Sequence, residues 1–287
     1  MATGTNIRTY FEGTWHEGDV HVMRAADHGA WLGSSVFDGA RHANGLHPDL
    51  LAHCRRVNNS AHAMGITPTH SAEEIYSITV DGLKFYPKSA AVYIRPMYWA
   101  LEGEHMAVMP KAGETGFCIC LEDIPMPSPN KTTTLTTTSF QRPVLASSVV
   151  NAKAGCLYPN NARMLREAME KGFDNALVAD ALGNVAETAT SNVFMAKNGE
   201  VYTPVANGTF LAGITRSRIM GLLQDAGYSV HEAVLSFDDV RAADEVFLTG
   251  NMAKVVSVSR FDDIHYQRGP VATEALELYW SWAANAK

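Results

Sequence analysis

Lys153 stands among small residues, in the segment Asn151-Ala-Lys-Ala-Gly155. Most lysines are charged and lie on the surface, so an exposed lysine is the simplest interpretation of this position. A lysine in the interior behaves differently, because desolvation lowers its pKa and leaves a neutral, nucleophilic amine. Such an amine condenses with an aldehyde to form a Schiff base. The segment by itself indicates either a surface lysine or a reactive one.

Other segments could hold an anionic, heteroaromatic ligand. Leu211-Ala-Gly-Ile-Thr215 leads into a predicted helix, where free backbone N–H groups and the helix dipole favour a phosphate. Thr215 is expected to cap this helix and to donate its hydroxyl group. Arg56 could add positive charge, although a lone arginine on a helix is usually solvated. Glu187, in the polar segment 184–192 between strands, is either a surface carboxylate or a group that keeps a ring nitrogen protonated.

Tyr93 and Arg95 alternate along a predicted strand. Side chains two residues apart on a strand face the same side, so a hydroxyl group and a guanidinium group lie together there. That combination suits a carboxylate. An arginine on a strand is more often an edge or surface residue, so the pair points to a carboxylate site only together with other observations.

Metal sites and several common catalytic motifs are missing. Cys118 and Cys120 share one face of a strand but lack the second half of a zinc site. With Cys54 and Cys156 they fit reduced cysteines of a cytoplasmic protein. The sequence contains no Walker loop, no Gly-x-Ser-x-Gly elbow and no His-Glu-x-x-His motif. We therefore expect no bound metal.

The composition of the chain limits the kinds of partner that the protein is expected to bind. The 287 residues are 46% hydrophobic and 18% charged, as in an ordinary globular protein. The net charge of -7 argues against a nucleic acid or an anionic membrane as the main partner. Residues 1–10 contain no apolar signal core, and no run of 18 apolar residues follows. We expect a cytoplasmic protein without nucleic-acid or membrane partners.

Short strands and helices are predicted to position these side chains. In the first part, an apolar stripe predicts a helix over residues 48–64, and a capping box at Ser71-Ala-Glu-Glu74 opens a second helix. Residues 90–99 and 116–123 read as strands. Three prolines in residues 124–130 then predict a linker, because proline cannot sit within a sheet.

The second part mixes strands, helices and hairpins. Asn198-Gly199 predicts a tight hairpin turn. We expect strands at 132–140, 175–180, 193–197, 201–203 and 244–249, and helices at 160–171, 215–226 and 270–284. The pattern predicts an α+β protein with a small N-terminal domain at 1–123, a linker at 124–131 and a larger domain at 132–287.

Taken together, these segments resemble the fold type IV, or class IV, aminotransferases that use pyridoxal 5'-phosphate (PLP), in particular the branched-chain amino acid aminotransferases. The resemblance runs from about residue 21 to residue 256, and its strength lies in the collinear order of individually weak matches. The matching stretches are His21-Val-Met-Arg24, Gly33-Ser-Ser-Val-Phe-Asp-Gly-Ala-Arg41, His53-Cys-Arg-Arg-Val57, Tyr93-Ile-Arg-Pro96, Asn151-Ala-Lys-Ala-Gly155 with Tyr158, residues 183–194, Leu211-Ala-Gly-Ile-Thr-Arg216 and Ala243-Asp-Glu-Val-Phe-Leu-Thr-Gly250.

The resemblance implies a role for each matching position. Lys153 matches the Schiff-base lysine, Glu187 the carboxylate at the pyridine nitrogen, and Tyr158 the tyrosine at the phenolic oxygen. Phosphate binding is implied for Arg56, Ile214, Thr215 and Asn251, and packing on the ring for Leu211. Substrate binding is implied for Phe37, Gly39, Tyr93, Arg95 and Met252. The family architecture places the cofactor between a small N-terminal domain and a larger C-terminal domain. It also implies a homodimer with a shared active site.

Some positions depart from the family pattern. Leu32 stands where branched-chain enzymes carry a tyrosine, and Asn251 and Met252 replace a smaller pair. The expected reaction moves an amino group from a branched-chain or related α-amino acid to a 2-oxo acid such as 2-oxoglutarate. Two alternatives stay open: a transaminase of the same fold acting on (R)-amines or D-amino acids, and an enzyme like aminodeoxychorismate lyase. The role of Cys156, close to Lys153, also stays open.

Overall fold

The computed structural model describes residues 4–286, which fold into two compact units. The first unit contains the described residues up to Met126 together with Asn151–Leu157, and the second contains Pro127–Val150 and the described residues from Tyr158 onward. The chain leaves the first unit after Met126, within the segment predicted as a linker. The return of Asn151–Leu157 to the first unit was not anticipated from the sequence. The sequence-based limits of the domains stay a prediction.

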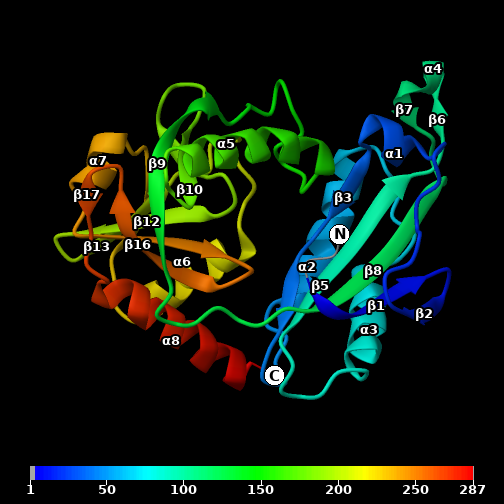
Figure 1. Ribbon diagram of the computed structural model, residues 1–287, viewed down its shortest axis with the longest axis horizontal. Helices are drawn as coiled ribbons and strands as arrows, with labels where there is room; N and C mark the ends of the chain where they lie inside the picture. Colours follow the sequence, from blue (N-terminus) through cyan, green and yellow to red (C-terminus); the bar gives the residue numbers. More distant parts are fainter. Residues whose placement is uncertain (1–3, 287) are drawn as a thin grey trace. The chain divides into compact units, whose positions relative to one another are not determined.

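The first unit is built on a six-stranded sheet whose main path runs in the order β2-β1-β8-β5-β3 (Figure 1). Strand β4 pairs with β5 outside this path. All of its strand pairs are antiparallel. The helices α2 and α3 pack against β3, β4, β5 and β8. The elements are β1 (Thr5–Phe11), β2 (Thr14–Glu17), α1 (His28–Leu32), β3 (Ser35–Phe37), β4 (Ala40–His42), α2 (Leu50–Ala63), α3 (Ala72–Leu83), β5 (Val92–Ala100), β6 (Gly103–Glu104), α4 (His105–Val108), β7 (Met109–Pro110), β8 (Thr115–Asp123) and η1 (Gly155–Leu157).

Strand β5 shows how the sequence divides the sheet into two faces. Val92 and Ile94 are fully buried, while Tyr93 and Arg95, which alternate with them, are half-buried. Because successive side chains of a strand point to opposite faces, Tyr93 and Arg95 share one face, as predicted. The predicted capping box of α3 is also confirmed, since Ser71 and Glu74 bond each other's backbone N–H groups.

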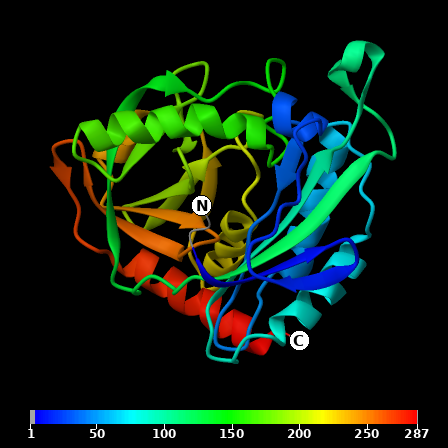
Figure 2. The same cartoon turned by 45° about the vertical axis from the view of Figure 1, so that its right-hand side comes forward.

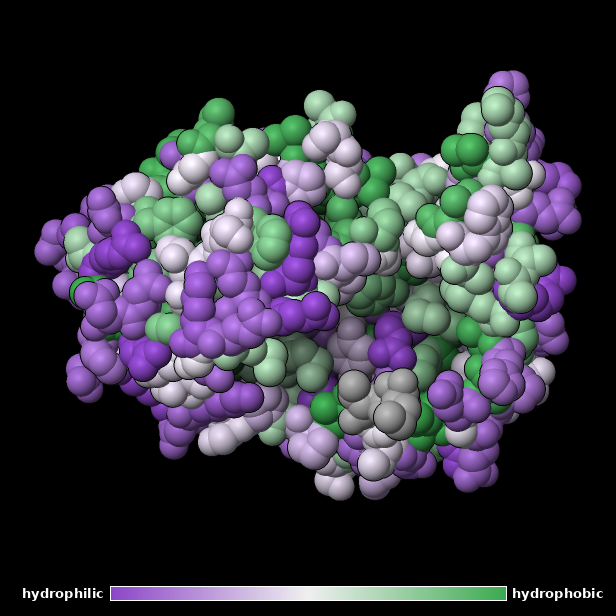
Figure 3. Space-filling model, turned by 45° about the horizontal axis from the view of Figure 1, so that its top comes forward, coloured by the Kyte–Doolittle hydropathy of each residue, from purple (hydrophilic) through white to green (hydrophobic). Residues whose placement is uncertain are grey.

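A hairpin made of β6, α4 and β7 projects from the first unit. Its apolar side chains are exposed, with Met106 at 93%, Val108 at 67% and Met109 at 52%. Figure 3 shows hydrophobic residues on this projecting tip, at the upper right of the view. Water-exposed apolar side chains gathered in this way mark a surface suited to contact with another protein.

The second unit has a nine-stranded mixed sheet in the order β11-β10-β9-β16-β15-β12-β13-β14, with β17 pairing β16. Figure 2 shows its C-terminal helix, in red, running along the orange and yellow elements of the same unit. The elements are β9 (Thr132–Gln141), α5 (Tyr158–Glu170), β10 (Asn175–Ala179), β11 (Val185–Thr188), β12 (Asn192–Lys197), β13 (Glu200–Pro204), α6 (Ile214–Asp225), β14 (Val230–Ala233), α7 (Phe237–Arg241), β15 (Glu245–Gly250), β16 (Lys254–Phe261), β17 (Ile264–His265) and α8 (Pro270–Asn285).

Both faces of this second sheet are buried. Along β12, Val193 and Met195 join one hydrophobic cluster, whereas Phe194 and Ala196 join another that includes side chains of α6 and α8. A strand buried on both faces is apolar at every position, which explains the unbroken run from Val193 to Ala196.

The predicted elements of the second unit are confirmed within a few residues at each end. At the predicted hairpin, Asn198 and Gly199 both have positive φ, of 52° and 80°. That geometry fits a type I′ turn, which Asn-Gly adopts readily. One local prediction is wrong: Thr215 does not cap α6. Gly213 occupies the N-cap, no side chain caps the helix, and Thr215 lies within the first turn.

Candidate active site

Lys153 is fastened to the first unit by its backbone. Its N–H donates to Ser60 Oγ at 3.0 Å, and its carbonyl oxygen accepts from Phe37 N–H at 3.1 Å. The side chain is half-buried, and Nζ lies 4.9 Å from the centre of the Phe37 ring. The lysine is thus held over an aromatic ring at β3 rather than extended from the surface on a free loop.

Tyr93 lies opposite Arg41 in register, so the two side chains share one face of the sheet. A Cβ added to Gly39 would stand 2.5 Å from Tyr93 Oη, so a side chain at position 39 cannot be accommodated without displacing this hydroxyl group. Arg95 stacks beside the Tyr93 ring, with Cζ at 5.7 Å from its centre. The predicted pair is therefore assembled on one face, with Gly39 allowing the close approach.

Glu122 is a charged neighbour that sequence reasoning missed. It lies opposite Tyr93 on β8, and its Oε1 is 2.5 Å from Arg95 Nη2. Burial works against the charge on Arg95, but Cys120 and Glu122 outweigh it and raise the pKa of the guanidinium group. No spacing signal links the two residues, because they lie on different strands that only the sheet brings together.

Arg41 is a second residue that the sequence did not single out. Its side chain is fully buried, and Nη2 donates to the carbonyl oxygen of Ile124 at 2.6 Å. Within the described part of the chain, its Nη1 has no hydrogen-bond partner. Burial lowers the pKa of this guanidinium group, against the attraction of Tyr93 and Asp123.

Arg56, predicted to bind phosphate, is held by a buried carboxylate. Its Nε and Nη2 donate to Asp38 at 2.6 and 2.8 Å, and the Asp38 Oδ1 lies 2.7 Å from His53 Nδ1. Burial would raise the pKa of Asp38, but the Arg56 and His53 charges hold it well below its usual range. Asp38 thus fixes the orientation of Arg56 on α2.

Glu187 lies in the second unit, within strand β11 rather than in a surface loop. The surface interpretation is wrong, because the residue is buried. Its Oε1 lies 2.7 Å from Arg142 Nη2, and its Oε2 accepts from Asn192 Nδ2 at 3.1 Å. A carboxylate fixed between a cation and an amide can hold a further donor, such as a protonated ring nitrogen.

The start of α6 approaches Asn192 closely. A Cβ on Gly213 would stand 2.0 Å from Asn192 Oδ1, so glycine is required at this N-cap. Ile214 and Thr215 lie in the first turn of α6, which no side chain caps, and backbone N–H groups at such a helix start can bind an anion. Leu211, half-buried, precedes this turn.

The turn between β15 and β16 presents polar atoms that lack partners. Asn251 Oδ1 accepts from Lys254 Nζ at 2.8 Å, so the amide nitrogen of Asn251 points away from Lys254. Among residues 4–286, this nitrogen and Thr249 Oγ1 are buried with no hydrogen-bond partner. Met252 is 45% exposed. Lys254 is fully buried, which nothing in the sequence pattern predicted.

Tyr158 begins α5 in the second unit and is 37% exposed. Cys156 is exposed and belongs to the first unit with Lys153. Leu32, at the end of α1, is 41% exposed. The implied roles of Tyr158, Cys156 and Leu32 stay predictions.

These groups fit PLP by their chemistry. The first unit supplies a lysine amine beside an aromatic ring, a guanidinium held by Asp38, and a tyrosine–arginine pair. The second supplies a fixed buried carboxylate, an uncapped helix start and the buried amide nitrogen of Asn251 without a partner. Taken by itself, the first unit offers an amine suited to an aldehyde, and the second offers a carboxylate suited to a protonated ring nitrogen and donors suited to a phosphate.

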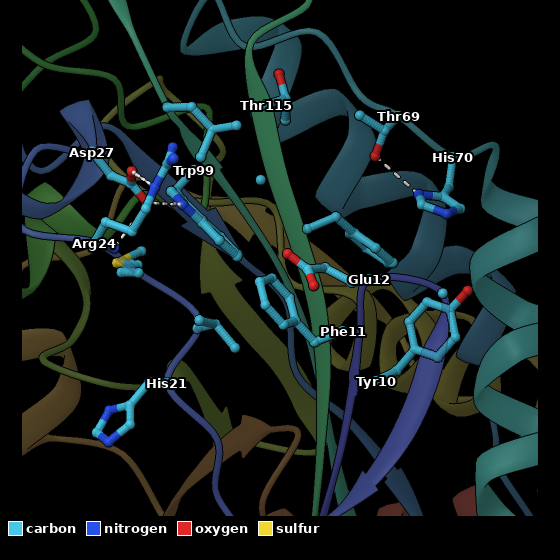
Figure 4. A pocket seen from close by; sticks show the side chains of 16 residues that line it. Tyr10, Phe11, Glu12, His21, Arg24, Asp27, Thr69, His70, Trp99 and Thr115 are labelled. Atoms are coloured by element: carbon cyan, nitrogen blue, oxygen red, sulfur yellow. Dashed lines mark hydrogen bonds and ion pairs between the residues drawn. The ribbon is translucent and has the colours of Figure 1, made fainter.

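A cavity of about 610 Å³ in the first unit contains none of the predicted site residues. Its lining includes Phe11, Trp99 and Phe117. Figure 4 shows Asp27 directed toward Trp99 and Arg24, and Asp27 Oδ2 accepts from Trp99 Nε1 at 3.1 Å. We do not place the chemistry there.

Residues 35–261 match the family described as amino-transferase class IV. The chain belongs to this family. This class IV aminotransferase is 30% identical over 281 residues to the branched-chain-amino-acid aminotransferase of Pseudomonas aeruginosa. The alignment covers 93% of this chain and 88% of the relative. The predicted family, enzyme class and α+β fold are thereby confirmed.

Solved structures resemble the class IV aminotransferase over nearly all of its length. An aminotransferase from Brucella abortus bound to PLP has a TM-score of 0.95 and 57% identity, covering 97% of this chain and 99% of that one. A branched-chain amino acid aminotransferase from Escherichia coli has a TM-score of 0.87 and 26% identity, covering 97% and 95%.

No helix within residues 4–286 combines the length and apolar character needed to cross a membrane. In the same part of the chain, no three or more His, Cys, Asp or Glu side chains are grouped to hold a metal ion.

Proposed function

We propose that this protein is a PLP-dependent aminotransferase that moves an amino group from a branched-chain or related α-amino acid to a 2-oxo acid such as 2-oxoglutarate. The observation that carries the proposal is Lys153 fastened over Phe37, in a chain matching the class IV family from residue 35 to residue 261. The relatives named as branched-chain aminotransferases support the donor class.

In this proposal, Lys153 carries the cofactor covalently. When bound, PLP supplies an electron sink for negative charge at the substrate Cα. The Lys153 amine, released when the substrate amine takes its place, would then take the substrate Cα proton as a general base and return it as a general acid. Glu187, held by Arg142 and Asn192, keeps the proton on the ring nitrogen, and Tyr158 donates to the phenolic oxygen. Leu211 packs on the ring.

The remaining roles concern binding. Arg56, the backbone of Ile214, the hydroxyl group of Thr215 and Asn251 hold the phosphate, since they combine positive charge with hydrogen-bond donors. For the substrate, the proposal assigns Tyr93 and Arg95 to the carboxylate. Phe37, Gly39 and Met252 shape the space around it.

The assembly is proposed to be a cytoplasmic homodimer with a shared active site. Exposed apolar side chains support pairing, including Trp31 at 59% and Met106 at 93%. Sedimentation of the holoenzyme tests this proposal, and a monomer at working concentration would contradict it.

The deciding experiment replaces Lys153. Purified holoenzyme is expected to be yellow, and borohydride should attach the cofactor to Lys153, as peptide mass spectrometry can show. Lys153→Ala should lose both this attachment and transamination, while the exposed Lys84→Ala should keep them. Trapped cofactor in Lys153→Ala would overturn the assignment.

Donor class is tested with a small panel. Leucine with 2-oxoglutarate should react faster than (R)-1-phenylethylamine with pyruvate. The reverse order would favour the (R)-amine reaction. Release of pyruvate from a chorismate-type substrate without any keto acid would indicate a lyase.

A further inference from the structure

The Arg142 side chain joins two elements of the second unit from a buried position. The residue directly follows β9, and its backbone N–H donates to the carbonyl oxygen of Ala179 at 2.9 Å. Its side chain is 7% exposed. Nη1 donates to Asn161 Oδ1 at 2.7 Å, and Nη2 lies 2.7 Å from Glu187 Oε1. The guanidinium group thereby connects α5 with β11.

Asn161 and Glu187 together fix this guanidinium group. Both acceptors are buried, so water does not readily replace either of them as a partner of Arg142. A planar group bonded at two nitrogens keeps its plane as well as its position. Asn161 lies one turn after Tyr158 on α5. The residues proposed for the ring nitrogen and for the phenolic oxygen therefore belong to elements that Arg142 connects.

The charge of Arg142 matters for any proton that Glu187 shares with another group. A buried carboxylate beside a ring nitrogen can exist as an ion pair or, with the proton moved to the carboxylate, as two neutral groups. Burial favours the neutral form, because both charges lose hydration. A cation fixed 2.7 Å from the carboxylate opposes this effect by attracting its negative charge.

The same cation repels a protonated ring nitrogen, but more weakly. Arg142 contacts Oε1 of Glu187, whereas Asn192 contacts Oε2. A group bonded to the carboxylate on the side away from Arg142 lies farther from the cation than the carboxylate does. Because the Coulomb energy falls with distance, the attraction of the carboxylate exceeds the repulsion of the nitrogen. The net effect of Arg142 is to favour the ion pair.

We propose that Arg142 is a positioning residue that keeps Glu187 ionised, so that the proton shared with the cofactor's ring nitrogen stays on the nitrogen. The inference rests on the proposed function and deepens it at the same site. Arg142 acts through Glu187, and Asn161 holds the guanidinium group in place. The proton remains on the ring throughout, so Arg142 neither gives nor takes one.

The test observes the ring nitrogen in holoenzyme reconstituted with PLP isotopically labelled at that atom, because its NMR shift reports its protonation. In the wild type, the nitrogen should be protonated at neutral and mildly alkaline pH. Arg142→Gln keeps a hydrogen-bond donor but removes the charge, and the unprotonated fraction should rise by about tenfold or more. Arg142→Lys keeps the charge and should retain the wild-type signal. Arg166→Met, which removes an exposed arginine from α5, is the matched control and should change nothing.

Asn161→Ala covers the case in which Arg142→Gln does not fold. It leaves Arg142 in place but removes one of its two anchors, so the unprotonated fraction should rise by a smaller factor. A ring nitrogen that stays as protonated as in the wild type in the folded variant overturns the inference, and so does an unprotonated nitrogen in the wild type at neutral pH. In these cases the proposed transamination stands. No transamination and no cofactor trapped at Lys153 in the wild type would instead refute the proposed function.

Discussion

Asp38 holds Arg56 at two nitrogens of the same guanidinium group, with Nε–Oδ2 at 2.6 Å and Nη2–Oδ1 at 2.8 Å. The carboxylate is fully buried, and the Arg56 side chain is 17% exposed. A two-point contact fixes the plane of the guanidinium group as well as its position. The orientation of the proposed phosphate-binding arginine therefore depends on Asp38.

Replacing Asp38 should weaken cofactor binding. In Asp38→Asn, one Arg56 donor loses its acceptor and the guanidinium group is free to turn. Hydrogen bonds to charged groups contribute about 1.5–3 kcal/mol, so PLP affinity should fall by roughly 10- to 100-fold. Titration of the apoenzyme with PLP measures this loss. Glu73 pairs with Arg55 on the surface. The control variant Glu73→Gln should therefore bind PLP normally.

The same pair should make stability depend on pH in a defined direction. The pKa of Asp38 lies well below its usual range, because Arg56 and His53 outweigh the effect of burial. A depressed carboxylate pKa stabilises the fold fully above the unfolded value of about 4, and this stabilisation is lost as pH falls through the folded value. At neutral pH, the free energy of unfolding measured in urea should be about 3–5 kcal/mol lower for Asp38→Asn than for the wild type. The difference should shrink below about pH 4; a gap that widens in acid contradicts the pairing.

Gly213 should not tolerate alanine. The added Cβ would stand 2.0 Å from Asn192 Oδ1 and displace the amide that donates to Glu187. We expect weaker PLP binding and a destabilised apoenzyme, measured by titration and by urea unfolding. Gly221→Ala is the matched control on the same helix, because a Cβ there meets nothing within 4 Å. It should stabilise the protein by about 1 kcal/mol, as alanine does in a helix interior.

Glu187→Gln should slow the chemistry more than it weakens binding. Its amide cannot hold a proton on the ring nitrogen as a carboxylate does, and it leaves Arg142 without its anion. The rate of the half-reaction with leucine, followed by stopped flow, should fall by about 10²–10³-fold. Glu170→Gln, an exposed change on α5, should leave the rate intact. An unchanged rate in Glu187→Gln would remove this residue from the proposed mechanism.

Lys254→Met tests the turn before β16. The lysine is fully buried and donates to Asn251 Oδ1, so methionine keeps the volume but frees the amide. We expect weaker binding of PLP by about tenfold, the loss of one hydrogen bond from a charged donor. The exposed Lys84→Met serves as control. Normal affinity in Lys254→Met would mean that Asn251 does not depend on this contact.

The sequence determined most of the local structure. The capping box at Ser71, the Asn198-Gly199 turn and the strand periodicity around Tyr93 were read correctly, because each depends on residues close together in the chain. Collinear short segments were also enough for the family and for the prediction that Lys153 is reactive. Those signals are carried by residue type and spacing alone.

The tertiary structure decided which charges meet. Arg95 faces Glu122, Arg142 faces Glu187, and neither pair is visible in the sequence because strand order, not spacing, brings its members together. Thr215 was placed at a cap that Gly213 occupies, since a helix start shifts easily by a residue or two. Buried ion pairs cost desolvation unless their partners are in place, so only the folded chain decides which charges can be buried.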